Sequence, residues 1–187
     1  MELVIRNMVC DRCKAAVEAI LMDHELLPEH IALGVVELKQ APSAVQLGGI
    51  RKALLKSGFE LVDAPSQVLV ERIKAAVVTF VHQSDGLRER VNLSSYIAAA
   101  LNKEYGALSS LFSQIEGITI ERFYLLQRLE RVKELMQYGD STLNEIADKT
   151  GFSSAAHLSA QFKKFVGITP TAFRSSGLGR RPIDRVS

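Results

Sequence analysis

Apolar residues along the chain change their spacing near residue 65, and this change predicts two different kinds of domain. Before that point, short apolar runs suited to strands alternate with stretches at helical spacing. The expected elements are strands at Leu3–Ile5 and Phe59–Val62 and helices at Lys14–Met22 and Ile50–Lys56. The apolar run 31–38 is broken at Gly34 and predicts either one bent strand or a tight hairpin. This alternation predicts a small α+β domain over residues 1–65.

Residues 66–91 are expected to form a linker helix. Apolar side chains from Val70 to Val81 recur along one helical stripe. The helix could bridge the two halves, pack on a neighbouring domain, or pair with a second copy in a homodimer. Its apolar run 75–81 is far too short to span a membrane.

Residues 92–175 have helical spacing throughout and contain an internal repeat. Identical residues recur at an offset of 50. The matching pairs are Leu108/Leu158, Ser109/Ser159, Phe112/Phe162, Gly117/Gly167, Ile118/Ile168, Thr119/Thr169 and Phe123/Phe173. A long helix over residues 120–137 is expected to join the two copies. The segment is therefore predicted to be all-α and to hold one helical unit twice.

The second copy has the layout of a helix-turn-helix. A polar cap at Ser141 or Thr142 opens a short apolar helix, and Gly151–Phe152 forms the turn. A second helix follows and ends at Gly167. A helix presented in this way has the size of the DNA major groove. The pattern therefore predicts a protein that binds double-stranded DNA.

Charge and composition refine this prediction. The 187-residue chain carries a net charge of only +2, but residues 1–65 carry −2 and residues 93–187 carry +3. Much of the positive excess lies in a basic tail, residues 176–187. This polarity suits DNA binding by the C-terminal half. No nucleophile motif, glycine-rich phosphate loop or paired carboxylates are visible, so an enzyme is not expected.

The tandem arrangement resembles the DNA-binding domain of the AraC/XylS family of bacterial transcription regulators. The motifs that carry the resemblance are Ile146–Ala147, Gly151–Ser154, Phe162–Lys164, Gly167–Pro170 and Phe173–Arg174. The resemblance implies that each repeat places one helix in the major groove. The long helix would hold the two recognition helices about one DNA turn, near 34 Å, apart.

The resemblance assigns recognition helices to residues 154–165 and 107–115. In the second repeat it implies groove or phosphate contacts from Ser154, Ala155, His157, Ala160, Gln161, Lys163, Lys164 and Arg174. In the first repeat it implies contacts from Ser109, Ser110, Ser113 and Gln114. Solvent exposure without any DNA contact is the alternative for each polar residue. Many family members have basic residues where this chain has Ser110, Ala160 and Ser113, so the second repeat is expected to supply most of the affinity.

Two cysteines lie between the first expected strand and helix, in Met8–Cys13. A Met-X-Cys-X-X-Cys loop in this position, with the helix–Gly58–strand sequence further on, resembles a heavy-metal-associated domain. That resemblance implies a ferredoxin-like βαββαβ fold over residues 1–65, although Asn7 stands where Gly is usual. A thiol at a helix N-terminus is expected to favour its thiolate, with Arg12 and Lys14 acting in the same direction.

The chemistry of Cys10 and Cys13 leaves three alternatives. Two thiolates could hold Cu(I) or another soft metal ion. Zinc would require four ligands, for which Met8, His24 or a second chain would have to contribute. The pair could instead be a redox dithiol, or carry no chemistry, with one thiol buried in the core.

The sequence therefore favours a cytoplasmic transcription regulator without a membrane segment. No secretory signal is visible, and paired thiols without an export signal fit a reducing compartment. The N-terminal domain would sense a signal or mediate association. The alternative is a metal-handling protein whose helical half docks to a partner protein.

Overall fold

Contacts divide the chain into two compact units, Met1–Ala76 and Val77–Ser187. The computed structural model describes residues 1–82, 92–138 and 141–176. The boundary lies inside helix α3 (Pro65–His82), which therefore contributes residues to both units. The rest of the expected linker, 83–91, and the tail from 177 onward lie outside the described residues.

The first unit has the element order βαββαβ, followed by the first part of α3. In chain order the elements are β1 (Glu2–Arg6), α1 (Asp11–Asp23), β2 (Pro28–Ala32), β3 (Val35–Leu38), α2 (Ala44–Lys56) and β4 (Glu60–Val62). Within the described residues they form a four-stranded sheet of order β2-β3-β1-β4, antiparallel throughout. Gly34, with φ of +76°, forms the turn between β2 and β3, so the hairpin alternative for residues 31–38 is confirmed.

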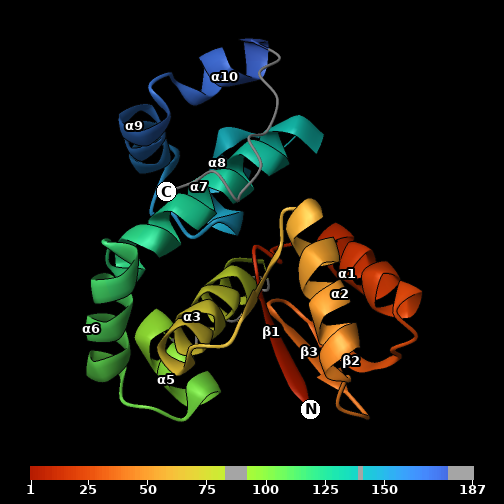
Figure 1. The fold of residues 1–187 in the computed structure, drawn as a ribbon. Helices are drawn as coiled ribbons and strands as arrows, with labels where there is room; N and C mark the ends of the chain where they lie inside the picture. The colour runs from red at the N-terminus through yellow and green to blue at the C-terminus, as the bar shows by residue number, and fades with distance from the viewer. Residues whose placement is uncertain (83–91, 139–140, 177–187) are drawn as a thin grey trace. The chain divides into compact units, whose positions relative to one another are not determined.

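The two faces of this sheet are covered by different helices. Leu3 and Ile5 of β1 point into a core shared with α1 and α2, which lie together over one face (Figure 1). Alternate residues of a strand face opposite sides, so Val4 and Arg6 point the other way. There Val4 is buried, and Arg6 donates from Nε to Glu71 of α3 at 2.9 Å. The first part of α3 therefore covers the second face of the sheet.

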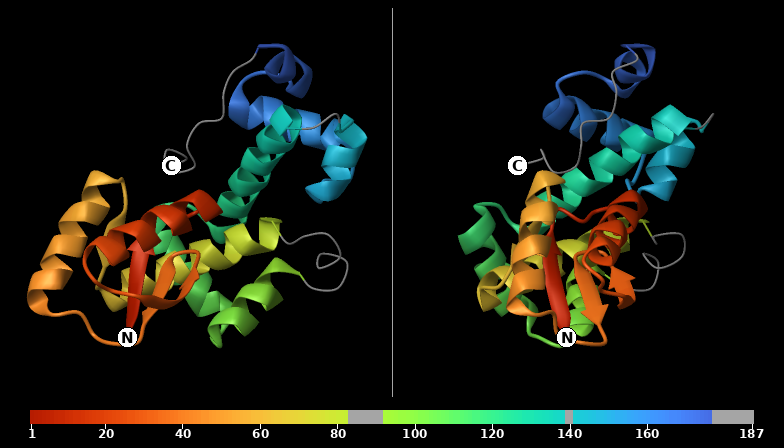
Figure 2. Two further views of the ribbon diagram at one scale, coloured as in Figure 1. Left: turned by 90° about the vertical axis from the view of Figure 1, so that its right-hand side faces the viewer. Right: turned by 45° about the vertical axis from the view of Figure 1, so that its right-hand side comes forward.

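The second unit is helical throughout its described residues. Besides the end of α3, it contains α5 (Leu93–Leu101), α6 (Tyr105–Glu116), α7 (Ile120–Tyr138), α8 (Leu143–Lys149), α9 (Ala155–Val166) and α10 (Pro170–Ser176). Figure 2 shows α7 as one continuous helix running from the pair α5–α6 to the pair α8–α9. We call these the first and the second helix pair.

The internal repeat of the sequence corresponds to a repeated packing contact between two phenylalanine side chains. The ring centroids of Phe112 and Phe123 lie 5.7 Å apart, and those of Phe162 and Phe173 lie 5.5 Å apart. The second helix of each pair ends at a glycine in the left-handed region. Helix α6 ends at Gly117, and α9 ends at Gly167. The predicted tandem of helical units is therefore confirmed.

Candidate nucleic-acid interface and thiol pair

The second helix pair is built by local caps around a small apolar core. Thr142 and Glu145 form a capping box at the start of α8, and the hydrogen bonds from Thr142 lower the pKa of Glu145. Ser154 caps α9 by accepting a hydrogen bond from the backbone N–H of His157. Leu158 and Phe162 are fully buried on the inner face of α9. The opposite face of α9 is thereby turned outward.

The predicted groove residues of α9 fall into two groups. His157, Ala160, Lys163 and Lys164 are exposed, whereas Ala155 and Gln161 are half-buried. Ser154 is exposed, but its side chain is engaged as the helix cap. Arg174 is also exposed, and it donates from Nη2 to the carbonyl oxygen of Ser141 at 2.8 Å. The cationic end of α9 is thus accessible, and its caps hold the helix start in place.

The predicted residues of α6 lie on the corresponding face of the first pair. Ser110 and Gln114 are exposed, and Ser109 and Ser113 are half-buried. Glu104 occupies the cap position of α6 and makes no side-chain capping bond. At an offset of 50 residues, Ser113 and Gln114 replace Lys163 and Lys164. The first pair therefore offers hydrogen-bonding groups without the cations of the second.

The first pair also carries a hydrogen bond that the second lacks at the corresponding positions. The Tyr105 hydroxyl donates to Oε1 of Glu121 at 2.6 Å, joining the start of α6 to the start of α7. This bond lowers the pKa of Glu121, while burial and the same bond raise the pKa of Tyr105. The offset-50 counterparts are Ala155 and Thr171. The bond places a carboxylate, which repels phosphate, beside the start of α6.

Arg128 of α7 supports the turn of the second pair, a role that the sequence analysis did not predict. Its Nε donates to the carbonyl oxygen of Thr150 at 2.7 Å, and its guanidinium carbon lies 3.8 Å from the ring centroid of Phe152. The His157 ring meets Phe152 edge-on, with centroids 5.6 Å apart. The position of Arg128 in the sequence of a long helix does not distinguish it from a charged residue that is exposed to solvent. The contact depends on tertiary packing.

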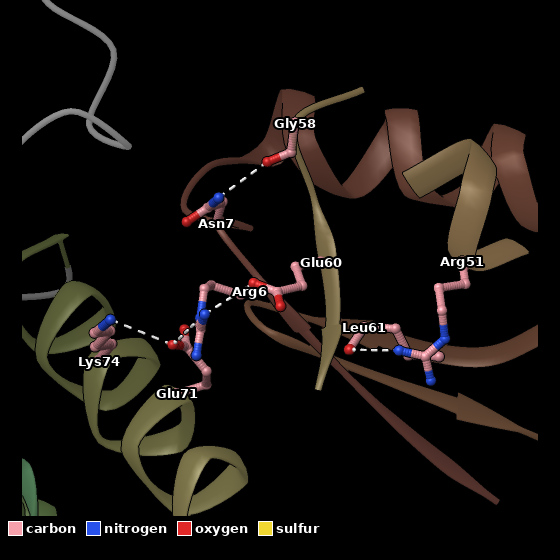
Figure 3. Close-up of polar contacts among 8 residues, drawn as sticks. All are labelled: Arg6, Asn7, Arg51, Gly58, Glu60, Leu61, Glu71 and Lys74. Atoms are coloured by element: carbon pink, nitrogen blue, oxygen red, sulfur yellow. Dashed lines mark hydrogen bonds and ion pairs between the residues drawn. The ribbon is translucent and has the colours of Figure 1, made fainter. Parts of the chain in front are cut away.

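Cys10 and Cys13 lie together at the start of α1. Their Sγ atoms are 3.1 Å apart, and both side chains are half-buried. Cys10 is the N-cap residue, with extended backbone at φ of −154°, and Cys13 lies in the first helical turn. The loop before them contains Asn7 in the left-handed region (φ +71°), where its Nδ2 donates to the Gly58 carbonyl oxygen at 2.9 Å (Figure 3). Asn tolerates this conformation better than most residues other than Gly.

The thiolate that the sequence predicts at Cys13 is not favoured. Burial, followed by the hydrogen bond with Cys10, raises the pKa of the Cys13 thiol. Lys14 forms an ion pair with Asp11 at 2.9 Å, which offsets its charge beside the thiols. At Cys13, burial and the hydrogen bond with Cys10 therefore outweigh the backbone hydrogen bonds at Val9 and Cys10, which lower the pKa.

The other two side chains named as metal ligands differ in their place in the fold. Met8 is buried in the core of the first unit, with 3% of its surface exposed, and Cys13 packs against the same core. His24 lies at the opposite end of the 13-residue helix α1, about 20 Å away at 1.5 Å per residue. Among the described residues, no group of three or more His, Cys, Asp or Glu is placed to hold a metal ion. Even with Met8, the described residues therefore supply fewer than the four ligands that zinc requires.

Comparison with known proteins identifies the helical segment. Residues 97–176 match the family described as helix-turn-helix domain. A probable transcriptional regulator, LumQ from Photobacterium leiognathi, is 24% identical over 149 residues, covering 77% of this chain and 58% of LumQ. The chain thus spans a little over half the length of that relative.

Two solved structures share this fold. The C-terminal domain of AraT, a response regulator from Geobacillus stearothermophilus, superposes with a TM-score of 0.51 at 27% identity, covering 62% of this chain and 88% of that domain. An AraC-type DNA-binding-domain regulator from Chromobacterium violaceum gives 0.50 at 26% identity, covering 61% and 96%. The C-terminal segment of this chain therefore matches a helix-turn-helix domain family and has the fold of an AraC-type DNA-binding domain.

Across the residues that the structure describes, no helix is both long enough and apolar enough to cross a membrane.

Proposed function

We propose that the protein is a transcription regulator that binds specific double-stranded DNA through its AraC-type domain, with the second helix pair supplying most of the affinity. The observation that carries this proposal is the outward face of α9. It presents His157, Ala160, Lys163 and Lys164 to solvent on a helix that caps and core packing hold in place. A helix of this size fits the major groove, and lysines at its end can neutralise phosphates.

The contrast between the two pairs supports this division of labour. Lys103 is the only basic residue between Val91 and Ile120 in the sequence. Phosphate contacts dominate DNA affinity, so α6 would read bases with little electrostatic anchoring. We therefore propose that Ser110 and Gln114 adjust specificity while Lys163, Lys164 and Arg174 hold the duplex.

The salt dependence of DNA affinity tests the proposal. Each phosphate contact contributes about 0.9 to the slope of log K against log salt concentration. The double variant K163A/K164A should lower that slope by up to about 2 and weaken binding to all sequences. The matched control S113A/Q114A, at the corresponding positions of α6, should leave the slope unchanged. An unchanged slope in K163A/K164A would contradict the assignment.

For the N-terminal unit we infer a ferredoxin-like sensing domain in which Cys10 and Cys13 hold a soft metal ion. Its βαββαβ order and its β2-β3-β1-β4 sheet support the fold assignment. The adjacent half-buried sulfurs support the site, because two thiolates suit a soft ion such as Cu(I), whereas zinc would require four ligands. Binding would regulate DNA affinity only if the ion preferred one arrangement of the protein over another.

An anaerobic Cu(I) titration of the reduced protein against a chromogenic chelator tests this site. Wild type should bind one equivalent tightly, and C10S/C13S should lose it. The variant M8L, which changes a core residue and keeps both thiols, should bind as wild type does. Equal weak binding by wild type and C10S/C13S would rule out the copper site and leave the DNA-binding proposal intact.

A further inference from the structure

His157 is the one large side chain exposed on the N-terminal half of α9 among the described residues. Its neighbours on this part of the helix, Ala155, Ala156 and Ala160, carry only methyl groups. Residues three apart on a helix lie on the same face, so His157 and Ala160 share the outward surface. Small neighbours allow the helix to approach a surface closely, with the imidazole as the most protruding group.

Two contacts hold this ring in position, and a third holds its backbone. Its Nδ1 is 3.0 Å from the hydroxyl oxygen of Ser153, and its edge meets the ring of Phe152. Its backbone N–H donates to the Ser154 cap at 3.1 Å. An exposed side chain normally loses rotamer freedom on binding, and a ring held in this way has already lost it. The ring is therefore preorganised.

The support extends to α7. Phe152, on which the ring rests, is itself covered by the Arg128 guanidinium at 3.8 Å. Arg128 also bonds to the Thr150 carbonyl oxygen, one residue before Gly151, which adopts a φ of +70°. A continuous series of contacts thus joins Arg128 of α7 to Phe152, Phe152 to His157, and His157 to Ser153. At an offset of 50, Ala107 stands in place of His157, so α6 has no counterpart.

The contact at Nδ1 leaves Nε2 as the ring nitrogen without a hydrogen-bond partner among the described residues. Imidazole has two neutral tautomers and one cation, and Nε2 carries a proton in one tautomer and in the cation. In the tautomer with the ring proton on Nε2, Nδ1 accepts a hydrogen bond from the Ser153 hydroxyl. Nε2 is then a donor that has no acceptor among the described residues.

We propose that His157 is a specificity-determining residue that donates from Nε2 to N7 of a purine in the major groove. Guanine and adenine both present an N7 acceptor there, and neither pyrimidine does. This inference rests on the proposed function, because it names the class of base that the second helix pair reads. Ser153 is a positioning residue that fixes the ring through Nδ1.

A DNA site selected by the wild-type protein provides the test. Each purine of the site is replaced in turn by its 7-deaza analogue, which lacks the N7 acceptor, and affinity is measured by fluorescence anisotropy at constant salt. One replacement should weaken wild-type binding roughly 3- to 10-fold, the effect of one hydrogen bond. H157A and H157Q should bind the unmodified site more weakly and show no further loss on that replacement.

Two further variants separate the possible outcomes. S153A should show a smaller discrimination at the same purine, because the ring is no longer held. K163A should weaken binding to both DNAs equally and retain the full discrimination. The inference is overturned if H157A discriminates as wild type does or if no replacement has an effect. Failure of wild type to select any site would overturn the proposed function as well.

Discussion

The rings of Phe112 and Phe123 lie 5.7 Å apart at an interplanar angle of 54°, and both side chains are buried. The same relationship recurs 50 residues later between Phe162 and Phe173. Each of these two phenylalanine contacts joins one helix to the helix that follows it, so α6 packs on α7 and α9 packs on α10. The same phenylalanine contact therefore supports both α6 and α9, although the exposed faces of these two helices differ in charge.

Truncation of either inner phenylalanine should destabilise the second unit strongly. F112A and F162A each remove a fully buried ring, and such changes cost about 3–5 kcal/mol. All four tyrosines of the chain lie after Ala76 and there is no tryptophan, so tyrosine fluorescence reports unfolding of this unit. I115A, on the same helix as Phe112 but 36% exposed, is the control and should cost much less. Equal losses in F112A and I115A would contradict this packing.

Replacement of Arg128 should loosen the turn of the second helix pair. R128K keeps the charge, but lysine cannot both bond to the Thr150 carbonyl and lie flat on the Phe152 ring. The loss of one charged hydrogen bond and one cation–π contact predicts a cost of about 2–4 kcal/mol.

R131M is the control for this prediction. Arg131 lies on the same helix and pairs with Glu134 at 2.8 Å, with both side chains partly exposed. Its loss should cost below about 1 kcal/mol. Amide hydrogen exchange at residues 148–153 should accelerate in R128K and remain unchanged in R131M. The reverse order would contradict the support assigned to Arg128.

The bond between Tyr105 and Glu121 should give the second unit a pH-dependent stability. It lowers the folded-state pKa of Glu121, so its contribution is complete above the unfolded pKa, about 4.3, and is lost as pH falls through the lower folded value. Y105F should therefore reduce stability at pH 7 by about 0.5–1 kcal/mol, a small effect because Glu121 is exposed. The difference from wild type should shrink below pH 4.

Thermal unfolding at pH 7 and pH 3.5 measures this change. In an E121Q background, the effect of Y105F should no longer depend on pH in this window, because the titrating group is absent. A wild-type–Y105F difference that grows towards acid would contradict the assigned sign.

The attachment of α3 to the sheet should depend on Glu71. Its carboxylate is 5% exposed and accepts hydrogen bonds from Arg6 at 2.9 Å and Lys74 at 3.2 Å (Figure 3). E71Q weakens both ionic contacts and should cost about 1–3 kcal/mol. E60Q removes the other carboxylate near Arg6, which is 49% exposed, and should cost below about 1 kcal/mol. Exchange of the β1 and β4 amides should accelerate in E71Q more than in E60Q; equal acceleration would contradict the role of Glu71.

The repeat and the strand–helix alternation could be predicted because they depend on local signals. Glycine stops, polar caps and apolar spacing lie within a few residues of the elements that they define. Helix α2 begins at Ala44, six residues before the predicted start at Ile50. The prediction placed the start too late because Gly48 and Gly49 lower the helix propensity of this segment. The capping box of Ser43 and Gln46 was the signal that could have corrected the prediction. A Cβ atom at Gly49 would lie 2.7 Å from the His24 ring, so any larger residue there would require this ring to move.

The candidate sites were predicted less completely because they depend on tertiary contacts. The exposure of Lys163 and Lys164 follows from the helical period alone. The stack of Arg128 on Phe152 joins residues 24 apart, and no local pattern predicts it. Similarly, the position of Cys13 at a helix start could be predicted, but the burial that raises its pKa could not.

The most direct test of the central claim is selection from a pool of randomised duplex DNA by the full chain, followed by sequencing. The account predicts enrichment of one motif whose most constrained positions cluster in a single major-groove segment. It also predicts that K163A/K164A enriches no motif at the same salt concentration, while S113A/Q114A still enriches one. A wild-type protein that enriches no sequence above the starting pool would contradict the assignment as a sequence-specific DNA-binding regulator.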